Sequence, residues 1–465
     1  MLQKSSDSLA KALCDAPVLA APVPPAAPLP LLKYIWTARK NAIAAFHSDV
    51  YRDWIVETKL WKLHTFIVNH PAGIRRVLID NADNYVKGNI EPCIASSSSH
   101  ADFIAADKWR ERRRTMSSVL SHRCMAPNAA LVFDSAQALL ERWSALRPGL
   151  PVEVSSEMAR LTLAILSGIA FSAEMAEMIP AIERTLVRNH GEPLFDLLDF
   201  VPLLRRPWTA FKRKRTHRAL KRLNASLDAL VRKRSAEDAP ASGDLLGRLL
   251  GERDAQTGQL SAGQIQTEIA TFIDAGLQSI SFALTWIWYL LSQHPAEEAR
   301  LHAELDEVLT GAVPGIEHIS RLAYTKAVIE ESLRLYPPLH TLAWRAALDE
   351  DEVCGLKIPK GATITIVPWV LHRHTKLWDR PGRFEPSRFL PERSEGRPRY
   401  AYLPFGAGPR VSIGPSFMMM TLTLVVAAIA QRYRLRLVPD YPVKVQGLAY
   451  LRPRYGLKAT LEKRV

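Results

Sequence analysis

The chain has 465 residues, of which 48% are hydrophobic and 23% charged, and its formal net charge is +14. This apolar content is sufficient for a large core and excludes an intrinsically disordered chain. The positive charge favours an acidic partner, an anionic surface or an acidic substrate, without choosing among them. The four cysteines are widely separated, with no Cys-x-x-Cys pair. Their spacing argues against a zinc site or a disulfide framework and favours reduced thiols in a cytoplasmic protein.

Residues 1–30 are predicted to form a flexible leader. The stretch 16–32 is apolar but contains six prolines, which favours an extended segment over a membrane-spanning helix. The first residues lack a basic stretch followed by an apolar one, so we expect neither a signal peptide nor a membrane span. We expect residues 31–465 to form a single domain.

Helical patterns dominate the rest of the chain. Apolar spacing and proline positions predict helices near 31–50, at 71–78, over most of 154–230, and at 264–292, 295–309 and 418–429, with strands at 65–68, 362–366 and within 433–461. The densely basic stretch 205–222 is interpreted first as a solvated helix face, and alternatively as a surface for anionic lipid or an acidic partner. His372 and His374 have no metal-ligating neighbours in the sequence, and a surface position is open to either.

The most unusual stretch runs from Phe405 to Gly414 with the sequence Phe-Gly-Ala-Gly-Pro-Arg-Val-Ser-Ile-Gly. Three glycines and a proline predict a tight loop that ends at the start of a buried helix. A glycine-rich loop alone is a weak signal, because such loops also bind phosphate or simply turn. The full order Phe-Gly-x-Gly-x-Arg-x-x-x-Gly resembles the haem-ligand loop of the cytochrome P-450 family. There the cysteine thiolate that binds the iron occupies the position of Ser412.

Two arginines resemble the family's ligands for the haem propionates. Trp109 and Arg113 are four residues apart and share one helix face, which alone would suggest surface packing. Beside the glycine loop, the pair resembles the family's Trp-x-x-x-Arg element. Arg345 has the spacing of the family's second propionate-binding arginine. Arginine suits this task because its planar guanidinium pairs with a carboxylate through two hydrogen bonds.

Three charged residues resemble the family's structural brace under the haem. Glu331 and Arg334, followed by Leu-Tyr-Pro-Pro, resemble its Glu-x-x-Arg helix, whose ion pair is buried. Arg388, in Phe-Glu-Pro-Ser-Arg-Phe, resembles the arginine that joins that pair.

The helix at 264–292 resembles the family's central helix, which crosses the haem and carries Ala-Gly-x-Glu/Asp-Thr. Without the resemblance it would be interpreted as a core helix with a packing glycine. Ala275 and Leu277 are expected to line an apolar pocket. The acid and threonine, which relay protons in the family, are replaced here by Gln278 and Ser279. Glutamine does not titrate, whereas serine keeps a hydroxyl, so the relay is expected to be weakened.

The resemblance implies a mainly α fold with a small β region, haem b as the cofactor and a small apolar organic substrate. Phe405, Gly406, Arg410, Ser412 and Gly414 are expected to form the haem-binding loop, with Ser412 as the ligand of the iron. The resemblance also implies an acidic ferredoxin- or flavodoxin-type electron donor and no nucleic-acid partner. The three methionines at 418–420 are interpreted as core packing.

The ligand and the proton relay both differ from the family pattern. A thiolate donates electron density to haem iron and favours O–O cleavage, so a serine oxygen is expected to weaken oxygen activation and raise the iron reduction potential. This combination resembles the engineered serine-ligated P-411 enzymes, and we predict carbene or nitrene transfer to C=C or C–H bonds as the favoured activity. One alternative is a monooxygenase or peroxygenase in which Ser412 is tolerated or inactivating. The other is a non-catalytic haem-binding or ligand-binding protein.

Overall fold

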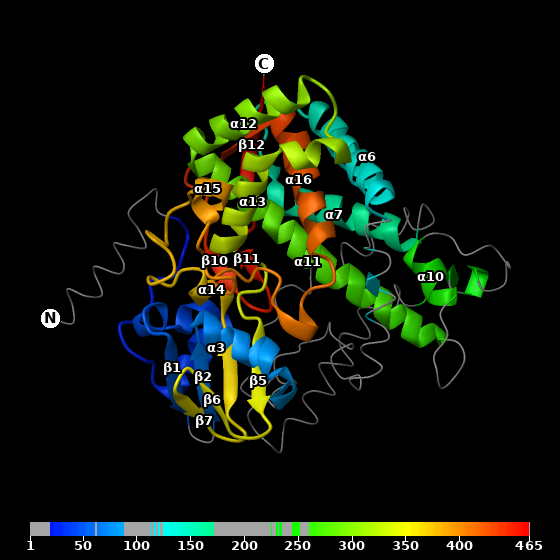
Figure 1. Cartoon of the computed structure of the whole chain (residues 1–465). Helices are drawn as coiled ribbons and strands as arrows, with labels where there is room; N and C mark the ends of the chain where they lie inside the picture. Colours follow the sequence, from blue (N-terminus) through cyan, green and yellow to red (C-terminus); the bar gives the residue numbers. More distant parts are fainter. Residues whose placement is uncertain are drawn as a thin grey trace.

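The computed structural model describes residues 19–60, 63–87, 124–171, 244–251 and 260–464, together with residues 113, 116, 117, 120, 225, 229, 230 and 232–234. Trp109 and the basic stretch 205–222 lie outside the described residues. Helices form the larger part of what is described, and a mixed sheet with the short helix α3 forms the lower left of Figure 1. The mainly α fold with a small β region is therefore confirmed.

The described helices are α2 (Leu31–Lys40), α3 (Pro71–Arg75), α6 (Met125–Ser144), α7 (Val154–Phe171), α10 (Leu245–Gly251), α11 (Ala262–Gln293), α12 (Pro295–Leu309), α13 (Ala323–Leu335), α14 (Pro368–Leu371), α15 (Pro391–Ser394) and α16 (Pro415–Arg432). The described strands are β1 (Ile55–Leu60), β2 (Leu63–Val68), β3 (Tyr85–Lys87), β4 (Val152–Glu153), β5 (Ala343–Ala347), β6 (Asp351–Val353), β7 (Leu356–Ile358), β8 (Thr363–Ile366), β9 (Tyr433–Leu437), β10 (Val445–Gly447), β11 (Leu451–Pro453) and β12 (Lys458–Lys463).

Helix α11 is the central element and crosses the body diagonally in Figure 1. Its 32 residues span about 48 Å at 1.5 Å per residue. It begins with a capping box, in which the Gln264 backbone N–H donates to Ser261 Oγ and the Ser261 N–H donates to Gln264 Oε1. Its second half is buried almost all round because α7, α13 and α16 pack against it. The helix predicted at 264–292 is therefore confirmed.

Helix α16 begins directly after the glycine loop and packs against α6 and α13. Among the described helices, α7 and α16 are each long and apolar enough to cross a membrane. Most of each lies inside the protein, however, with 67% and 72% of their apolar windows buried. Such burial is the property of core helices, whose apolar surface is satisfied by protein contacts.

The larger sheet has five strands in the order β1-β2-β8-β5-β3. Strands β2 and β8 are parallel, and the other neighbouring pairs are antiparallel. This sheet has its own apolar core, which includes Phe66, Ile364 and Ile366. A three-stranded sheet, β4-β12-β9, and the pairs β10–β11 and β6–β7 complete the β region. The strand predicted at 65–68 lies within β2. The strand predicted at 362–366 corresponds to β8, which begins one residue later.

Residues 19–30, assigned from the sequence to a flexible leader, contact the helical body. The backbone N–H of Ala20 donates to Tyr289 Oη at 2.9 Å, and its carbonyl accepts a hydrogen bond from Tyr336 Oη at 3.0 Å. The carbonyl of Pro25 accepts a hydrogen bond from the Ser48 N–H at 2.8 Å. Residues 1–18 lie outside the described residues.

Candidate functional site

A cavity of about 230 Å³ lies between one face of α11 and the end of the glycine loop. Its lining comes from α7, α11, the loop, the first turn of α16 and a few residues between 113 and 120. The lining residues are Arg113, Met116, Leu120, Leu166, Glu268, Thr271, Phe272, Ala275, Gly276, Ser279, Ile280, Ser412, Ile413, Gly414, Phe417 and Met418. The cavity thus brings together residues more than 130 positions apart, including Ser279 and Ser412.

The glycine loop is held in one shape by local geometry. Gly406 and Gly408 both have a φ of +76°, a left-handed conformation that residues with a Cβ adopt at a cost. A Cβ on Gly408 would lie 1.9 Å from the carbonyl oxygen of Leu78, so the backbone of the neighbouring segment fills the space that a side chain would need. The Ser412 N–H donates to the Phe405 carbonyl at 2.9 Å and closes the loop.

Ser412 lines the cavity immediately before α16 begins. Its Oγ accepts a hydrogen bond from the Gly414 backbone N–H at 3.3 Å, and Gly414 is the N-terminal cap of the helix. The Ser412 oxygen therefore lies at the positive N-terminal end of α16, and apolar Phe417 and Met418 line the same cavity. Met418, interpreted from the sequence as core packing, is buried in the core and also lines the cavity.

Arg113 also lines the cavity, and its Nη2 donates a short hydrogen bond to the Val411 carbonyl of the loop. Burial, and then the positive charge of Arg410, lower the pKa of the Arg113 guanidinium. An anion held beside these two arginines would offset their mutual repulsion, as a carboxylate does for paired guanidinium groups. Arg345 lies on β5, opposite Ile364 of β8 and Lys87 of β3. It is not among the residues that line the cavity.

The residues of the expected proton relay lie on α11 but differ in position. Ser279 and Ala275 line the cavity, and Ser279 Oγ donates to the Ala275 carbonyl at 2.8 Å. Gln278 is 9% exposed, is not among the residues that line the cavity, and donates from Nε2 to Asp274 Oδ1 at 3.0 Å. The expectation that Leu277 lines the pocket is wrong, because Leu277 is packed in the core and is not among the residues that line the cavity. The helix turns by about 100° per residue, so Leu277 and Gln278 lie on other faces than Ala275 and Ser279.

Glu331 and Arg334 form a fully buried ion pair in which both side chains are 0% exposed. Arg334 Nε donates to Glu331 Oε2 at 2.6 Å and its Nη2 donates to Oε1 at 2.7 Å. Arg334 also donates to the carbonyls of His372, Pro381 and Arg383. Arg388 Nε lies 3.6 Å from Glu331 Oε1. The cluster therefore ties α13 to the chain between 372 and 388.

A surface position for His372 or His374, left open by the sequence, is wrong, since both are 0% exposed. The Leu403 N–H donates to His372 Nε2 at 2.9 Å, and Nδ1 lies 3.2 Å from the Arg334 carbonyl. Burial, followed by the positive charge of Arg334, lowers the pKa of His372 to about 3. His372 is therefore a neutral structural residue that links the brace to the segment preceding the loop. Among the described residues, no cluster of three His, Cys, Asp or Glu side chains could hold a metal ion.

Sequence reasoning did not find Glu268 and Thr271, the polar residues on the same face of α11. Both lie at helical spacing before Ala275, at seven and four residues, so counting back from Ala275 along one face would have identified them. Leu166 of α7 was also missed. A Cβ on Gly276 would lie 2.9 Å from its methyl groups, so Gly276 permits the close approach of α7 to α11.

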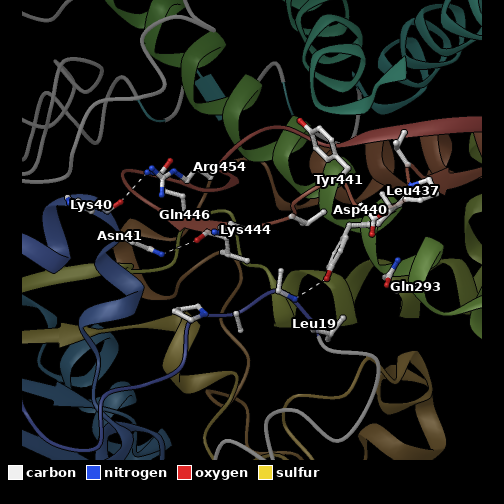
Figure 2. Close-up of a pocket in the computed structure, with 18 residues that line it drawn as sticks. Leu19, Lys40, Asn41, Gln293, Leu437, Asp440, Tyr441, Lys444, Gln446 and Arg454 are labelled. Atoms are coloured by element: carbon white, nitrogen blue, oxygen red, sulfur yellow. Dashed lines mark hydrogen bonds between the residues drawn. The ribbon is translucent and has the colours of Figure 1, made fainter. Parts of the chain in front are cut away.

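A second hollow of about 760 Å³ lies by the C-terminal end of α11 and is shown in Figure 2. It is bounded by the segment 19–22, the C-terminal end of α11 and the connection from β9 to β10. Lys40, Lys444, Arg454 and Asp440 contribute its charged side chains. None of the site residues predicted from the sequence lines it, so the cavity beside Ser412 is the candidate functional site.

The residues around the smaller cavity fit a haem group in all but the sulfur ligand. Ser412, Ile413 and Gly414 of the glycine loop line the cavity, and Arg113 beside them offers a guanidinium of the kind that pairs with a carboxylate. Ser412 supplies an oxygen where a thiolate would be expected. The fold and cavity together indicate a haem enzyme with a helical body.

Comparison with known proteins agrees with this class. The family model for cytochrome P-450 matches residues 22–458. Cyclooctatin synthase of Streptomyces melanosporofaciens is 35% identical over 407 residues, covering 84% of each chain. Cyclooctat-9-en-7-ol 5-monooxygenase of the same organism is 31% identical, covering 88% of this chain and 89% of the relative. The crystal structure of a cytochrome P-450 haem domain superposes with a TM-score of 0.76 at 23% identity, covering 96% and 98% of the two chains.

The chain belongs to the cytochrome P-450 family, whose members bind haem b. It is accordingly a haem-dependent oxidoreductase of that family.

Proposed function

We propose that the protein oxidises an apolar molecule of the terpenoid class in the cavity between α11 and Ser412. The observation that carries the proposal is the cavity itself, which has a largely apolar wall and is lined by both α11 and the end of the glycine loop. Met116, Leu120, Leu166, Phe272 and Phe417 give this cavity its apolar wall. Two relatives, cyclooctatin synthase and cyclooctat-9-en-7-ol 5-monooxygenase, are named for terpenoid products or substrates.

Haem b, when bound, would supply the redox chemistry. Within the chain, Ser412 would be the residue beneath the iron, while Arg113, Arg345 and Arg410 would hold the propionates, with Trp109 as a further contact. Phe405, Gly406 and Gly414 would keep the loop in shape. The apolar wall would orient the substrate and exclude water, and the Ser279 hydroxyl would hold a proton near the reacting carbon. Gln278 cannot supply that proton, because an amide does not titrate.

The ligand is tested with the reduced carbon monoxide complex of the haem-loaded chain and two variants. An oxygen ligand at 412 predicts that Ser412→Cys shifts the absorption band and lowers the iron reduction potential. Met418→Ala is the matched control, because Met418 and Met116 are the thioethers among the described residues that line the cavity. A spectrum that changes with Met418→Ala but not with Ser412→Cys would refute ligation by Ser412.

Turnover is tested by mass spectrometry of products from a panel of terpene hydrocarbons, with a surrogate ferredoxin system or peroxide. Oxidised product from the wild type supports the terpenoid oxidation, whereas product from Ser412→Cys alone would show that the cavity takes the terpene but that Ser412 inactivates the oxidation. Complete lack of product from both, with haem bound, would contradict it and favour a non-catalytic haem protein. An acidic electron donor accompanies the proposal, in line with the net charge of +14. A cytoplasmic location also accompanies it.

A second candidate is carbene or nitrene transfer, which the oxygen donor at 412 and the amide at 278 specifically favour. Both residues reduce the support for oxygen activation while leaving the cavity intact. Reduced wild type incubated with a diazoester and styrene under nitrogen should then form the cyclopropane faster than free haem. Equal rates for the protein and for free haem would refute this candidate without bearing on terpenoid oxidation.

A further inference from the structure

The hollow of about 760 Å³ by the C-terminal end of α11 has its positive charge at one end. Its charged lining residues, within the described part of the chain, are Lys40, Lys444, Arg454 and Asp440, so cations exceed carboxylates by two. Figure 2 shows Lys40, Lys444 and Arg454 toward the left of the hollow and Asp440 toward the right. An anion in the hollow is therefore attracted to one end and repelled from the other.

Strand β10 holds the three cations near one another. Gln446 Nε2 donates to the Lys40 carbonyl at 3.1 Å, and the Arg454 N–H donates to the Lys444 carbonyl at 2.7 Å. Lys444 and Gln446 are only two residues apart, so the backbones of all three cations meet at the start of this strand. Since Lys40 ends α2 and Arg454 follows β11, separate elements bring their charges to one place.

These cations are not neutralised by carboxylates. Among the described residues, none forms an ion pair with Lys40, Lys444 or Arg454. Lys40 Nζ lies 3.3 Å from the ring centroid of Trp36, and the Arg454 guanidinium lies 5.2 Å from that of Tyr455. An aromatic ring attracts a cation without cancelling its charge, so both side chains are able to pair with an anion.

A fourth cation lies behind the wall of the hollow. Arg452 of β11 is opposite Gln446 of β10, and its Nη2 donates to Gln446 Oε1 at 3.1 Å. Its Nε is buried and has no hydrogen-bond partner in the described structure, and burial lowers the pKa of the guanidinium. Because Gln446 lines the hollow, the charge of Arg452 lies one side chain away. A desolvated cation of this kind favours an anion nearby.

The remaining wall of the hollow is largely apolar. Leu19 and Pro22 line it from the segment before α2, and Leu437, Val438 and Val443 line it from the connection between β9 and β10. A purely ionic ligand would leave this wall in contact with water, whereas a ligand with an apolar chain would cover it. The volume of the hollow is within the range of small-molecule sites.

We propose that the hollow is a binding site for an amphipathic phosphate ester, a phosphate head joined to an apolar chain. The head binds between Lys40, Lys444 and Arg454, and the chain lies along Leu437 and Val443. A phosphate monoester carries about −1.5 to −2 charges at pH 7, which matches the excess of two cations better than a single carboxylate does. The hollow and the cavity beside Ser412 share no lining residue, so this site is separate from the oxidation site.

The test is calorimetric titration of the haem-loaded full chain with octyl phosphate, inorganic phosphate and octanol. Octyl phosphate should bind at least about tenfold more tightly than either of the other two, because only it contacts both the cations and the apolar wall. Its affinity should fall as sodium chloride is added, because salt screens exposed charges. Equal affinities for octyl phosphate and octanol, or no measurable binding of octyl phosphate, would overturn the site.

Four variants assign the binding to this hollow. Lys444→Met and Arg454→Met should each weaken octyl phosphate about fivefold, the effect of one exposed ion pair. Val443→Thr, which keeps the side-chain shape, should weaken octyl phosphate but not inorganic phosphate. Lys357→Met is the matched control, since this exposed lysine of β7 lies outside the hollow and its loss should change nothing.

Two results with these variants would overturn the proposal. Unchanged affinity in both Lys444→Met and Arg454→Met would place the ligand elsewhere. An equal loss in Lys357→Met would show only a general attraction to a chain of net charge +14. Neither result bears on terpenoid oxidation, which is measured by product formation.

Discussion

Replacing Gly408 with alanine tests whether the glycine loop has its shape because the backbone of Leu78 lies against it. Gly361, in the turn before β8, provides the matched control. The two glycines have φ values of +76° and +80°, but a Cβ on Gly361 meets nothing within 4 Å, whereas one on Gly408 would lie 1.9 Å from the Leu78 carbonyl oxygen. The left-handed conformation costs both variants about 1–2 kcal/mol.

The difference between the variants comes from the contact with Leu78. Leu78 is 7% exposed and belongs to the core of the five-stranded sheet, so its carbonyl cannot withdraw without disturbing that packing. Overpacking of this kind costs a further 1–3 kcal/mol, roughly. Gly408→Ala should therefore lower the free energy of unfolding by about 2–5 kcal/mol, measured by urea denaturation and circular dichroism. It should also retain less haem than Gly361→Ala. Equal losses of stability and equal haem content in the two variants would refute the reasoning.

Three further predictions concern buried titratable side chains. Glu331→Gln should lower the free energy of unfolding by about 3–5 kcal/mol, because it leaves Arg334 and Arg388 buried without their carboxylate. The control is Asp349→Asn, in an exposed pair with Lys360, which should lower it by less than about 1 kcal/mol. Equal urea midpoints for the two variants would contradict the burial of the Glu331 pair. His372 has a pKa lowered to about 3, so its contribution to stability is complete above its unfolded pKa of about 6.5 and is lost as the pH falls toward 3. His372→Gln should reduce the slope of stability against pH by about 1.4 kcal/mol per pH unit between pH 6 and 4, and an unchanged slope would show that the native histidine is protonated. Asp351 is desolvated, but hydrogen bonds from Arg76, Tyr85 and Asn81 together outweigh that burial and lower its pKa. The contribution of Asp351 to stability is therefore lost as the pH falls below about 4. Asp351→Asn should flatten the dependence of the free energy of unfolding on pH in acid. An unaltered pH dependence would rule out the hydrogen-bonded cluster around Asp351.

The sequence by itself located several of the helices and the order of the landmarks, but it did not predict α6, and the helix expected near 31–50 ends at Lys40. The long apolar pattern at 264–292 and the glycines from 406 to 414 are local signals, so α11 and the loop could be located without coordinates. The charged residues Glu331 and Arg334 could be paired because three residues on a helix share one face. Their complete burial, which changes the pair from a weak surface contact into a strong constraint, could not be inferred from spacing alone.

The tertiary structure alone decided which residues share the cavity. Ser279 and Ser412 meet there because α11 and the start of α16 pack in the same body, a contact across more than 130 residues that no local pattern encodes. Packing also placed Leu277 in the core, buried both histidines and left Glu268 facing the cavity. Helical periodicity states which residues share a face, but which face meets a cavity depends on the elements that cover the others.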